Sequence, residues 1–416
     1  IGEKRFSNSP FRGESTVKNQ QNSLRALCAR AATFAAFAAA ASVAQAQVTV
    51  QILHASDLEG GVTAIGDAPR FAAVVQGLEN DAALASVPSI LLSAGDNYIP
   101  GPFFSAAGDA SIRTPLRTAL GLNQVREREG RVDIAIMNIL GFDASALGNH
   151  EFDPGTTALR EIIGPDIRDG NNDGILDDAR WFGVDFPYLS SNLDFSLDTN
   201  LASLVESGIV SNTAFKGDPL NLAASAARKK LASATIVSRN GELFGIVGAT
   251  TPLLASISSP GATSVKNPGA GTNNMAQLAS ILQPVIDSVI AQGVNKVILV
   301  THLQQIALEQ QLVPLLRGVD IAIAGGSDTL LADGTDVLRM GDVAQGPYPI
   351  VTSNNDGDAA LVVSTDGQYS YVGRLVVQFD ALGRVIPASV NPAVSGAYAT
   401  DDQGVVAVWG NLVDPF

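Results

Sequence analysis

Cysteine, histidine and basic residues are scarce in this 416-residue chain, and each scarcity excludes a class of site. There is one cysteine, Cys28, and there are three histidines, His54, His150 and His302. A mechanism that needs imidazole must therefore draw on these three. The 26 Lys and Arg residues are outnumbered by 41 Asp and Glu, which leaves a formal charge of -15. This balance argues against nucleic acid as a partner, because sequence-independent binding depends on basic residues that neutralise phosphates.

Long apolar runs are also lacking, apart from an alanine-rich stretch near the start of the chain. Arg25 and Arg30 precede this stretch, Ala31–Val43, and the small-residue triplet AQA follows it at 44–46. Such a pattern is typical of a secretory signal peptide. We therefore expect residues 1–46 to be an upstream segment and signal peptide, and the protein to be periplasmic or secreted, with no membrane span. Cleavage after residue 46 would remove Cys28, which excludes disulfides and cysteine nucleophiles from the mature form.

The remainder of the chain alternates between two apolar patterns, as an α/β protein does. Short apolar or β-branched runs that end in polar or Gly-rich residues predict buried strands at Val48–Ala55, Ser89–Ala94, Asp143–Leu147, Lys296–Thr301 and Asp320–Ala324. Apolar residues at three- and four-residue spacing predict helices at about Pro69–Asn80, Arg131–Leu140, Ala276–Gln292 and Ala307–Arg317. The alternation predicts a layered sheet with helices on its faces.

Turn signals and long connections complete this outline. Asn240-Gly241 between Ala232–Ser238 and Leu243–Ala249 predicts a hairpin, and a second β-rich region is expected from 348 to 386. The connections at about 98–130 and 164–182 are longer than a crossover requires, so we expect insertions near the active face. The main domain is predicted to span residues 47–390, with 391–416 a tail or the truncated start of a C-terminal domain.

Polar clusters follow five of the strand-like runs. They are Asp57-Leu58-Glu59, Gly95-Asp96-Asn97, Gly148-Asn149-His150-Glu151, Thr301-His302 and Gly325-Gly326-Ser327-Asp328. Loops at the carboxyl ends of strands in an open α/β sheet converge on one crevice. Oxygen donors and imidazoles gathered there suit divalent cations, and two such ions about 3.5–4 Å apart promote phosphoryl displacement. The clusters therefore predict a metallohydrolase site.

Several longer motifs resemble one superfamily. They are GNHEFD at 148–153 with GDN at 95–97, LHASD at 53–57, FPYLSSN at 186–192, GIVGATTP at 245–252 and YSYVGRLVVQFDALGRV at 369–385. In this order, from Val48 to Ala388, they resemble the calcineurin-like metallophosphoesterases, in particular their 5'-nucleotidase-like and alkaline phosphatase branch. The resemblance implies an α/β/β/α fold, a layered β-sandwich flanked by helices.

The resemblance also implies roles for individual residues. Asp57 would bind the first metal, Asp96 would bridge two metals, and Asn149 and His302 would bind the second. His150 would be a catalytic group that binds the phosphoryl oxygens or protonates the leaving alkoxide, with its ring oriented by Asp153. His54 is expected to give structural support rather than to bind a metal.

Two motifs depart from the family pattern. The first site usually reads Asp-x-His, whereas this chain has Glu59, and the last motif usually reads Gly-His-x-His, whereas this chain has Gly326-Ser327-Asp328-Thr329. Because Glu59 and Asp328 are anionic oxygen donors, we expect a carboxylate-rich site with Asp328, rather than Ser327 or Thr329, as the last ligand. More oxygen and less imidazole favours Mn²⁺, Mg²⁺ or Ca²⁺ over Zn²⁺. The alternative is an inactive site kept for its shape.

One insertion contains a second pattern of oxygen donors. Asp169, Asn171, Asp173 and Asp177 follow the spacing at the start of a calcium loop, but Arg180 stands where an EF-hand has its bidentate Glu. The interpretations are an additional Ca²⁺ site or a solvated turn.

Together these observations predict an exported phosphomonoesterase with two divalent ions. It would hydrolyse phosphate monoesters by a metal-bound hydroxide, with a small phosphorylated substrate such as a nucleotide as its partner. The alternatives are a phosphodiesterase or cyclic-nucleotide hydrolase, and a catalytically silent calcium-binding surface protein of the same fold.

Overall fold

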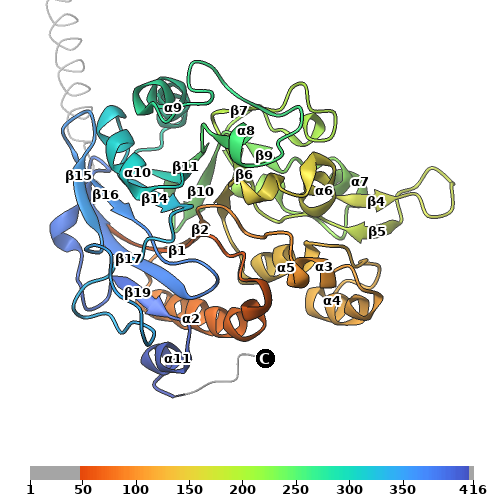
Figure 1. The fold of residues 1–416 in the computed structure, drawn as a ribbon, viewed down its shortest axis with the longest axis horizontal. Coiled ribbons are helices and arrows are strands. Elements are labelled where there is room, and N and C mark those ends of the chain that lie inside the picture. The colour runs from red at the N-terminus through yellow and green to blue at the C-terminus, as the bar shows by residue number, and fades with distance from the viewer. Residues whose placement is uncertain (1–46, 412–416) are drawn as a thin grey trace, which may run out of the picture. The chain divides into compact units, whose positions relative to one another are not determined.

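Two β-sheets packed face to face form the centre of the molecule (Figure 1). This computed structural model describes residues 47–411, and the predicted signal segment lies outside the described residues. The first sheet has the order β18-β17-β1-β2-β3-β6-β9, with β19 also paired to β17. The second has the order β15-β16-β14-β13-β11-β10-β8. Helices cover both outer faces, so the expected α/β/β/α class is confirmed.

The strands of the first sheet are β1 (Val48–Ala55), β2 (Ser89–Ser93), β3 (Ala144–Ala146), β6 (Tyr188–Leu189), β9 (Leu231–Ala232), β17 (Tyr371–Phe379), β18 (Val385–Ile386) and β19 (Gly396–Ala399). Those of the second are β8 (Val210–Ser211), β10 (Ala234–Arg239), β11 (Glu242–Thr250), β13 (Val297–His302), β14 (Ile321–Gly325), β15 (Ile350–Ser353) and β16 (Ala359–Val363). Two small antiparallel sheets pair β4 (Asp166–Arg168) with β5 (Asp178–Trp181) and β7 (Leu193–Asp194) with β12 (Ser264–Val265).

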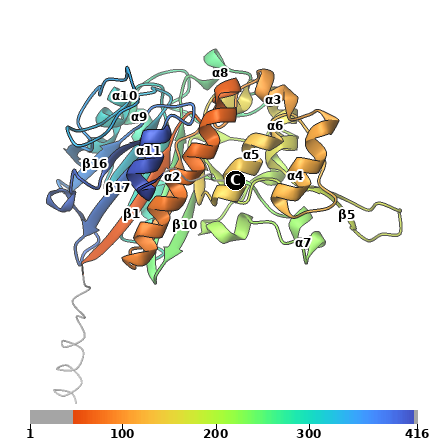
Figure 2. The ribbon, with the colours of Figure 1, turned by 90° about the horizontal axis from the view of Figure 1, so that it is seen from below.

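The helices divide between the two outer faces. α2 (Ala64–Leu84), α5 (Arg131–Leu140) and α6 (Gly155–Ile163) pack on the first sheet, and Figure 2 shows α2 and α5 over it with α11 (Asp402–Trp409) against α2. α9 (Met275–Ile290) and α10 (Ile306–Leu312) pack on the second. The shorter helices are α3 (Pro102–Ala106), α4 (Arg113–Leu120), α7 (Leu222–Ala226) and α8 (Leu254–Ile257).

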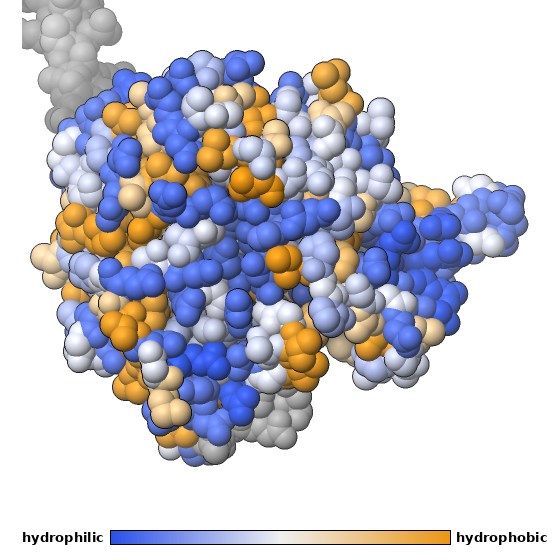
Figure 3. Space-filling model, viewed as in Figure 1, coloured by the Kyte–Doolittle hydropathy of each residue, from blue (hydrophilic) through white to orange (hydrophobic). Residues whose placement is uncertain are grey.

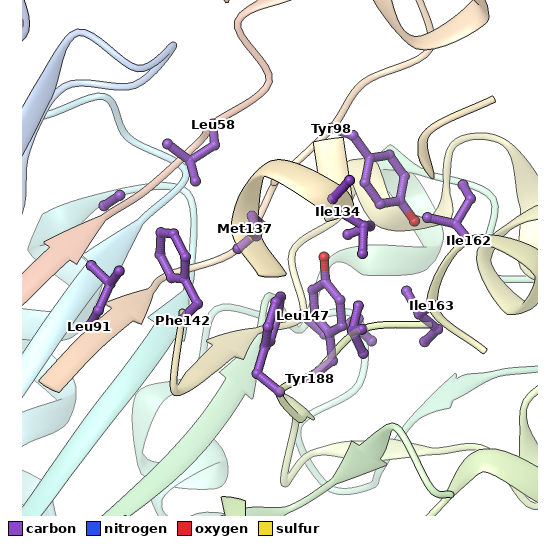
Figure 4. Close-up of a cluster of buried hydrophobic side chains, with 14 of the residues drawn as sticks. Leu58, Leu91, Tyr98, Ile134, Met137, Phe142, Leu147, Ile162, Ile163 and Tyr188 are labelled. Carbon is purple, nitrogen blue, oxygen red and sulfur yellow. The ribbon is translucent and has the colours of Figure 1, made fainter. Parts of the chain in front are cut away.

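β1 shows why its sequence is apolar almost throughout. Side chains alternate along a strand, so Val50 and Ile52 enter the layer between the sheets, whereas Leu53 and Ala55 enter the layer beneath the helices. Figure 4 shows that helix-side layer, where Leu91 of β2 and Tyr188 of β6 lie with α5 residues such as Met137.

Most predicted elements are confirmed with small shifts. β1 and α5 have the predicted bounds, and the Asn-Gly hairpin forms, with φ of 51° at Asn240 and 85° at Gly241. α2, however, begins at Ala64, before the predicted start at Pro69, which is accommodated inside the helix. The fold continues past residue 390, because β19 pairs with β17 and α11 contacts α2, so the predicted boundary lies within the folded unit.

The two predicted insertions differ in form. The first contains α3 and α4, and the second is the β4–β5 hairpin, which projects from the body and is hydrophilic in Figure 3. No helix among residues 47–411 is both long enough and apolar enough to cross a membrane.

Candidate metal centre

The predicted site residues meet where parallel strands of both sheets end. Asp57, Asp96 and Asn149 follow β1, β2 and β3 of the first sheet, which are parallel neighbours. His302 ends β13 and Asp328 follows β14 in the second sheet, and these strands are also parallel. The site therefore lies across the carboxyl ends of two layers, as the strand-end clusters predicted.

Asp96 stands at the centre of the cluster. Its Oδ2 lies 2.8 Å from Nε2 of His302 and 3.9 Å from Nε2 of His150. His302 Nε2 is also 3.9 Å from Asp57 Oδ1, and His150 Nε2 is 3.9 Å from Glu59 Oε1. Two groups with the geometry to hold an ion result, Asp57–Asp96–His302 and Glu59–Asp96–His150, and Asp96 belongs to both. A shared carboxylate is what a bridging ligand requires.

The grouping differs from the predicted division of ligands. The resemblance assigned Asp57 to one ion and His302, with Asn149, to the other, whereas the side chains pair His302 with Asp57 and Asp96. Without ions, each imidazole lies against the carboxylates that its charge attracts. Asn149 Oδ1 instead accepts a hydrogen bond from Nε2 of Gln304. The assignment of ligands to individual ions stays a prediction.

Asp328 approaches the cluster from the last motif. A Cβ added at Gly367 would lie 2.6 Å from Asp328 Oδ1 and 2.9 Å from Asp57 Cβ, so both aspartates lie against the same glycine. The neighbouring hydroxyls bond to each other, with Thr329 Oγ1 2.9 Å from Ser327 Oγ. Asp328 as the last ligand stays a prediction.

The backbone at these positions is held in the left-handed region. φ is 52° at Asp57, 52° at Asp96, 46° at Asp328 and 76° at Gln304. Non-glycine residues adopt this region rarely, at a cost of order 1 kcal/mol each, and such strain clusters at functional sites. The sharp turn after each strand directs these side chains into the crevice.

Glu151 organises the two loops that carry Asp96 and His150, and the sequence analysis did not assign it a role. Its carboxylate accepts hydrogen bonds from the backbone N–H of Gly148 at 2.8 Å, Asn97 at 2.7 Å and Asp96 at 3.1 Å. It is fully buried. The available signal for Glu151 was its position in the GNHEFD motif, between His150 and Asp153, since both of those residues had been given roles.

His302 is prepared to bind through one nitrogen. Its Nδ1 lies 2.8 Å from the carbonyl oxygen of Ala94, so the Nδ1–H donates there and Nε2 is left for a ligand. Nε2 is buried and lies 2.8 Å from Asp96 Oδ2 as an ion pair. Glu59 Oε2 is also buried and has no hydrogen-bond partner among residues 47–411. An unsatisfied buried polar atom of this kind fits a cation-binding site.

The electrostatics also fit cations. Burial, together with the charges of Asp96 and Asp57, raises the pKa of Glu59 to about 10. Burial opposes protonation of His302, yet Asp96 and Asp57 outweigh it and raise the pKa of the imidazole to about 10. Burial raises the pKa of Asp57 to about 6 despite the nearby His302. The raised pKa values of Glu59 and Asp57 mean that more carboxyl groups are gathered here than the two imidazoles can neutralise, so Glu59 keeps a proton, and divalent ions would take the place of such protons.

His150 lies at the edge of the cluster with a partly exposed ring. Its Nδ1 is 2.5 Å from Asp153 Oδ2, and Asp153 Oδ1 accepts a hydrogen bond of 2.6 Å from Ser258 Oγ. Burial opposes charge on the ring, but Asp96 and Asp153 raise its pKa above the ordinary value. The predicted pairing of His150 with Asp153 is therefore present in the structure, and Ser258 is an addition that the sequence did not reveal.

His54 lies apart from this chemistry. The ring is buried, its Nε2 is 2.8 Å from the hydroxyl of Tyr348, and the two rings stack at 5.8 Å. Burial lowers the pKa of His54 to about 3, so the ring is neutral. This environment agrees with the structural role expected for it.

The predicted calcium loop occupies the tip of the β4–β5 hairpin. Asp169 Oδ2 accepts from Gly174 N at 2.7 Å, and Asp177 Oδ1 accepts from Gly170 N at 2.7 Å. These carboxylates and Asn171 therefore bond to the loop's own backbone and side chains. A Ca²⁺ site here stays a prediction.

Several proteins similar in sequence to the chain are 5'-nucleotidases. No family model matches it. It is 31% identical over 271 residues to 5'-nucleotidase of Mus musculus, covering 65% of this chain and 38% of that protein. It is 28% identical over 281 residues to snake venom 5'-nucleotidase of Gloydius brevicauda, covering 67% and 38%. The chain thus spans less than half the length of these relatives.

Solved structures show the same fold. A 5'-nucleotidase precursor from Thermus thermophilus superposes with a TM-score of 0.54 at 24% identity, covering 87% of this chain and 57% of that one. The NAD nucleotidase of Haemophilus influenzae gives 0.53 at 20% identity, covering 85% and 50%. These structures show the fold, and the similarity in sequence to 5'-nucleotidases confirms the expected resemblance.

Proposed function

Starting from the confirmed resemblance to 5'-nucleotidases, we propose that this protein is an exported, metal-dependent phosphomonoesterase. The observation that carries the proposal is the pair of carboxylate–imidazole groups that share Asp96 at the carboxyl ends of both sheets. Two divalent ions supply positive charge at the transferring phosphoryl group and activate water as a nucleophile when bound. The residues that would hold them are Asp57, Glu59, Asp96, Asn149, His302 and Asp328. His150 belongs to one of the two groups, but we propose that it serves the substrate and not an ion.

The chain's own residues would bind and protonate the substrate. His150 has a partly exposed ring with Nε2 facing the cluster, so it can donate a hydrogen bond to a phosphoryl oxygen or a proton to the departing alkoxide. Asp153 holds Nδ1 and favours the charged imidazole. Asp96 Oδ1 accepts a hydrogen bond of 2.7 Å from the backbone N–H of His150, so the proposed acid is held next to the proposed bridging ligand.

The metal preference follows from the donor atoms. Glu59 and Asp328 bring oxygen where the family usually brings imidazole, and hard oxygen ligands suit Mn²⁺, Mg²⁺ or Ca²⁺ better than Zn²⁺. We therefore propose that the enzyme works with Mn²⁺, Mg²⁺ or Ca²⁺ bound. The relatives named as 5'-nucleotidases support a nucleotide monoester as the substrate, and a broad phosphomonoesterase is the coarser form of the same proposal.

Hydrolysis assays test this function directly. Purified protein is dialysed against chelator, then reloaded separately with Mn²⁺, Mg²⁺, Ca²⁺ or Zn²⁺ and offered an aryl phosphate monoester, AMP and an aryl phosphate diester. We expect monoester turnover, highest with Mn²⁺ or Mg²⁺. Turnover of the diester alone would favour the phosphodiesterase alternative. Activity on none of the three with any ion would favour the silent calcium-binding alternative.

Export is a separate part of the proposal. It is supported by the basic flank, the apolar run and the AQA triplet of residues 25–46. Expression of the chain in a Gram-negative host, followed by fractionation and N-terminal sequencing, tests it. A periplasmic or secreted product that begins at residue 47 is expected, whereas an uncleaved cytoplasmic product would contradict export.

A further inference from the structure

Gln304 has a backbone conformation that its residue type does not favour. It lies two residues after His302, in the turn between β13 and α10, with φ at 76°. Glutamine has no short side chain to stabilise the left-handed region, and glycine would adopt it without strain. The backbone conformation at Gln304 therefore costs free energy, and a functional role of its half-buried side chain would explain why this residue stands there.

The amide of Gln304 lies among the predicted ligands of the second ion. Its Nε2 donates a hydrogen bond to Oδ1 of Asn149. A Cβ added at Gly326 would lie 2.7 Å from Gln304 Nε2 and 2.7 Å from His302 Nε2. The amide and the imidazole thus lie against one glycine, which has φ of 81° and carries no side chain to separate them.

This position is beside the motif that lacks its histidines. Ser327 and Thr329 bond to each other and not to the cluster. Asp328 is the single donor that this motif brings there. In the division of ligands that the resemblance implies, the second ion would consequently have Asn149 and His302 beside the bridging Asp96, with no donor from the Ser327–Thr329 hydroxyls.

We propose that Gln304 is a ligand of the second ion, its Oε1 taking the place of an imidazole that this chain lacks. Nε2 and Oε1 belong to one planar amide, so a hydrogen bond from Nε2 to Asn149 keeps Oε1 beside the same ligands. A neutral oxygen donor suits a hard cation and adds no charge to a site already rich in carboxylates. The inference rests on the proposed function, because it presupposes two bound ions.

Three variants separate a ligand from a residue that is merely nearby. Gln304→Gly removes the amide and relieves the strained φ. Gln304→Glu keeps an oxygen at Oε1 but removes the N–H that bonds to Asn149. Gln305→Ala is the matched control, since Gln305 is an exposed glutamine next in the chain. Metal content is measured by elemental analysis after reloading with Mn²⁺, and affinity by calorimetric titration of Mn²⁺.

We expect only Gln304→Gly to lose metal affinity, and only for one of the two ions. Gln304→Gly should retain one tightly bound Mn²⁺ and weaken the other by at least about tenfold, the range seen when a metal site loses a supporting group. Its metal-free form should melt at or above the wild-type temperature, because the strain is gone. Gln304→Glu and Gln305→Ala should bind both ions at least as tightly as wild type.

The other possible outcomes show which of the two proposals is wrong. Two ions bound with unchanged affinity by Gln304→Gly would overturn the ligand role while leaving the proposed function intact. Equal weakening in Gln304→Glu and Gln304→Gly would show that the N–H group matters and Oε1 does not, which also overturns it. A wild-type protein that binds no Mn²⁺, Mg²⁺, Ca²⁺ or Zn²⁺ would overturn the proposed function itself.

Discussion

Asp153 Oδ2 lies 2.5 Å from Nδ1 of His150, three residues earlier in the same turn. This contact fixes the plane of the ring and leaves Nε2 directed toward the carboxylates. Because a charged imidazole gains from both sides, the pair holds a proton at the edge of the cluster where we propose that a phosphate ester binds. The pair is thus suited to donating that proton, and the ligands beside it to holding ions.

Replacing His150 tests that separation of roles. His150→Ala should lower kcat for an aryl phosphate by about 10²–10⁴-fold, the usual contribution of a positioned acid. Metal content, measured by elemental analysis, should be nearly unchanged. Loss of an ion from this variant would instead make His150 a ligand, and the roles assigned here would be wrong.

Asp96 and Glu59 should differ in how many ions depend on them. Asp96 belongs to both candidate ligand groups, whereas Glu59 belongs to one. We expect Asp96→Asn to lose both ions and Glu59→Gln to keep one, as measured by Mn²⁺ content after gel filtration. Retention of two ions by Asp96→Asn would exclude a bridging role.

Restoring imidazoles should change the preferred metal. The double variant Glu59→His/Ser327→His exchanges oxygen donors for nitrogen, which favours Zn²⁺. In competition dialysis with equal Mn²⁺ and Zn²⁺, the Zn²⁺ share should rise relative to wild type. Glu59→Ala/Ser327→Ala, which removes the same side-chain oxygens without adding a nitrogen ligand, is the control. An unchanged ratio would mean that the two motifs do not select the ion.

Asp133, which lies outside the candidate metal centre, should make the free energy of unfolding depend on pH. It is buried in α5, Oδ2 has no hydrogen-bond partner, and burial raises its pKa from 3.8 to about 7. Between these values the folded chain keeps a proton that the unfolded chain releases, so stability falls as pH rises and levels off above 7. Asp133→Asn should remove this dependence.

The size of that effect can be measured by denaturant unfolding. Between pH 4 and pH 8, the free energy of unfolding of the wild type should fall by roughly 2–4 kcal/mol more than that of Asp133→Asn. Asp81→Asn, at a helical aspartate with a side chain 52% exposed, is the control and should follow wild type. Parallel curves for wild type and Asp133→Asn would mean that Asp133 already has a partner that keeps it charged.

The sequence predicted those parts of the fold that follow from local pattern. β1 and α5 were delimited correctly because an apolar run with polar ends, and apolar residues at helical spacing, are local signals. The start of α2 was misplaced, because proline is common at a first helical position, yet Pro69 lies within the helix. Which sheet each strand joins depends on long-range pairing, which local pattern does not contain, and the resemblance supplied only the order of the layers.

The site was predictable as far as its residues sit in motifs. Asp57, Asp96 and His302 follow strands, and strand ends converge by topology. Gln304 has no such signal, since its relation to Asn149 depends on a turn with positive φ and on a residue 155 positions away. Ser258 and Glu151 likewise act through contacts that only the folded chain brings together.

The centre draws on both layers of the sandwich, and a hydrogen bond from His302 Nδ1 to the carbonyl of Ala94 already crosses between them. Ions bound there would cross-link two separately paired sheets at one end, while the opposite end is held by apolar packing and by Arg239 of β10, which donates to the carbonyl oxygen of Ser89 at 3.1 Å and pairs with Asp143. Amide hydrogen exchange should therefore slow on loading mainly in the last residues of β1, β2, β13 and β14. Saturating the centre would thus make the two layers open as one cooperative unit.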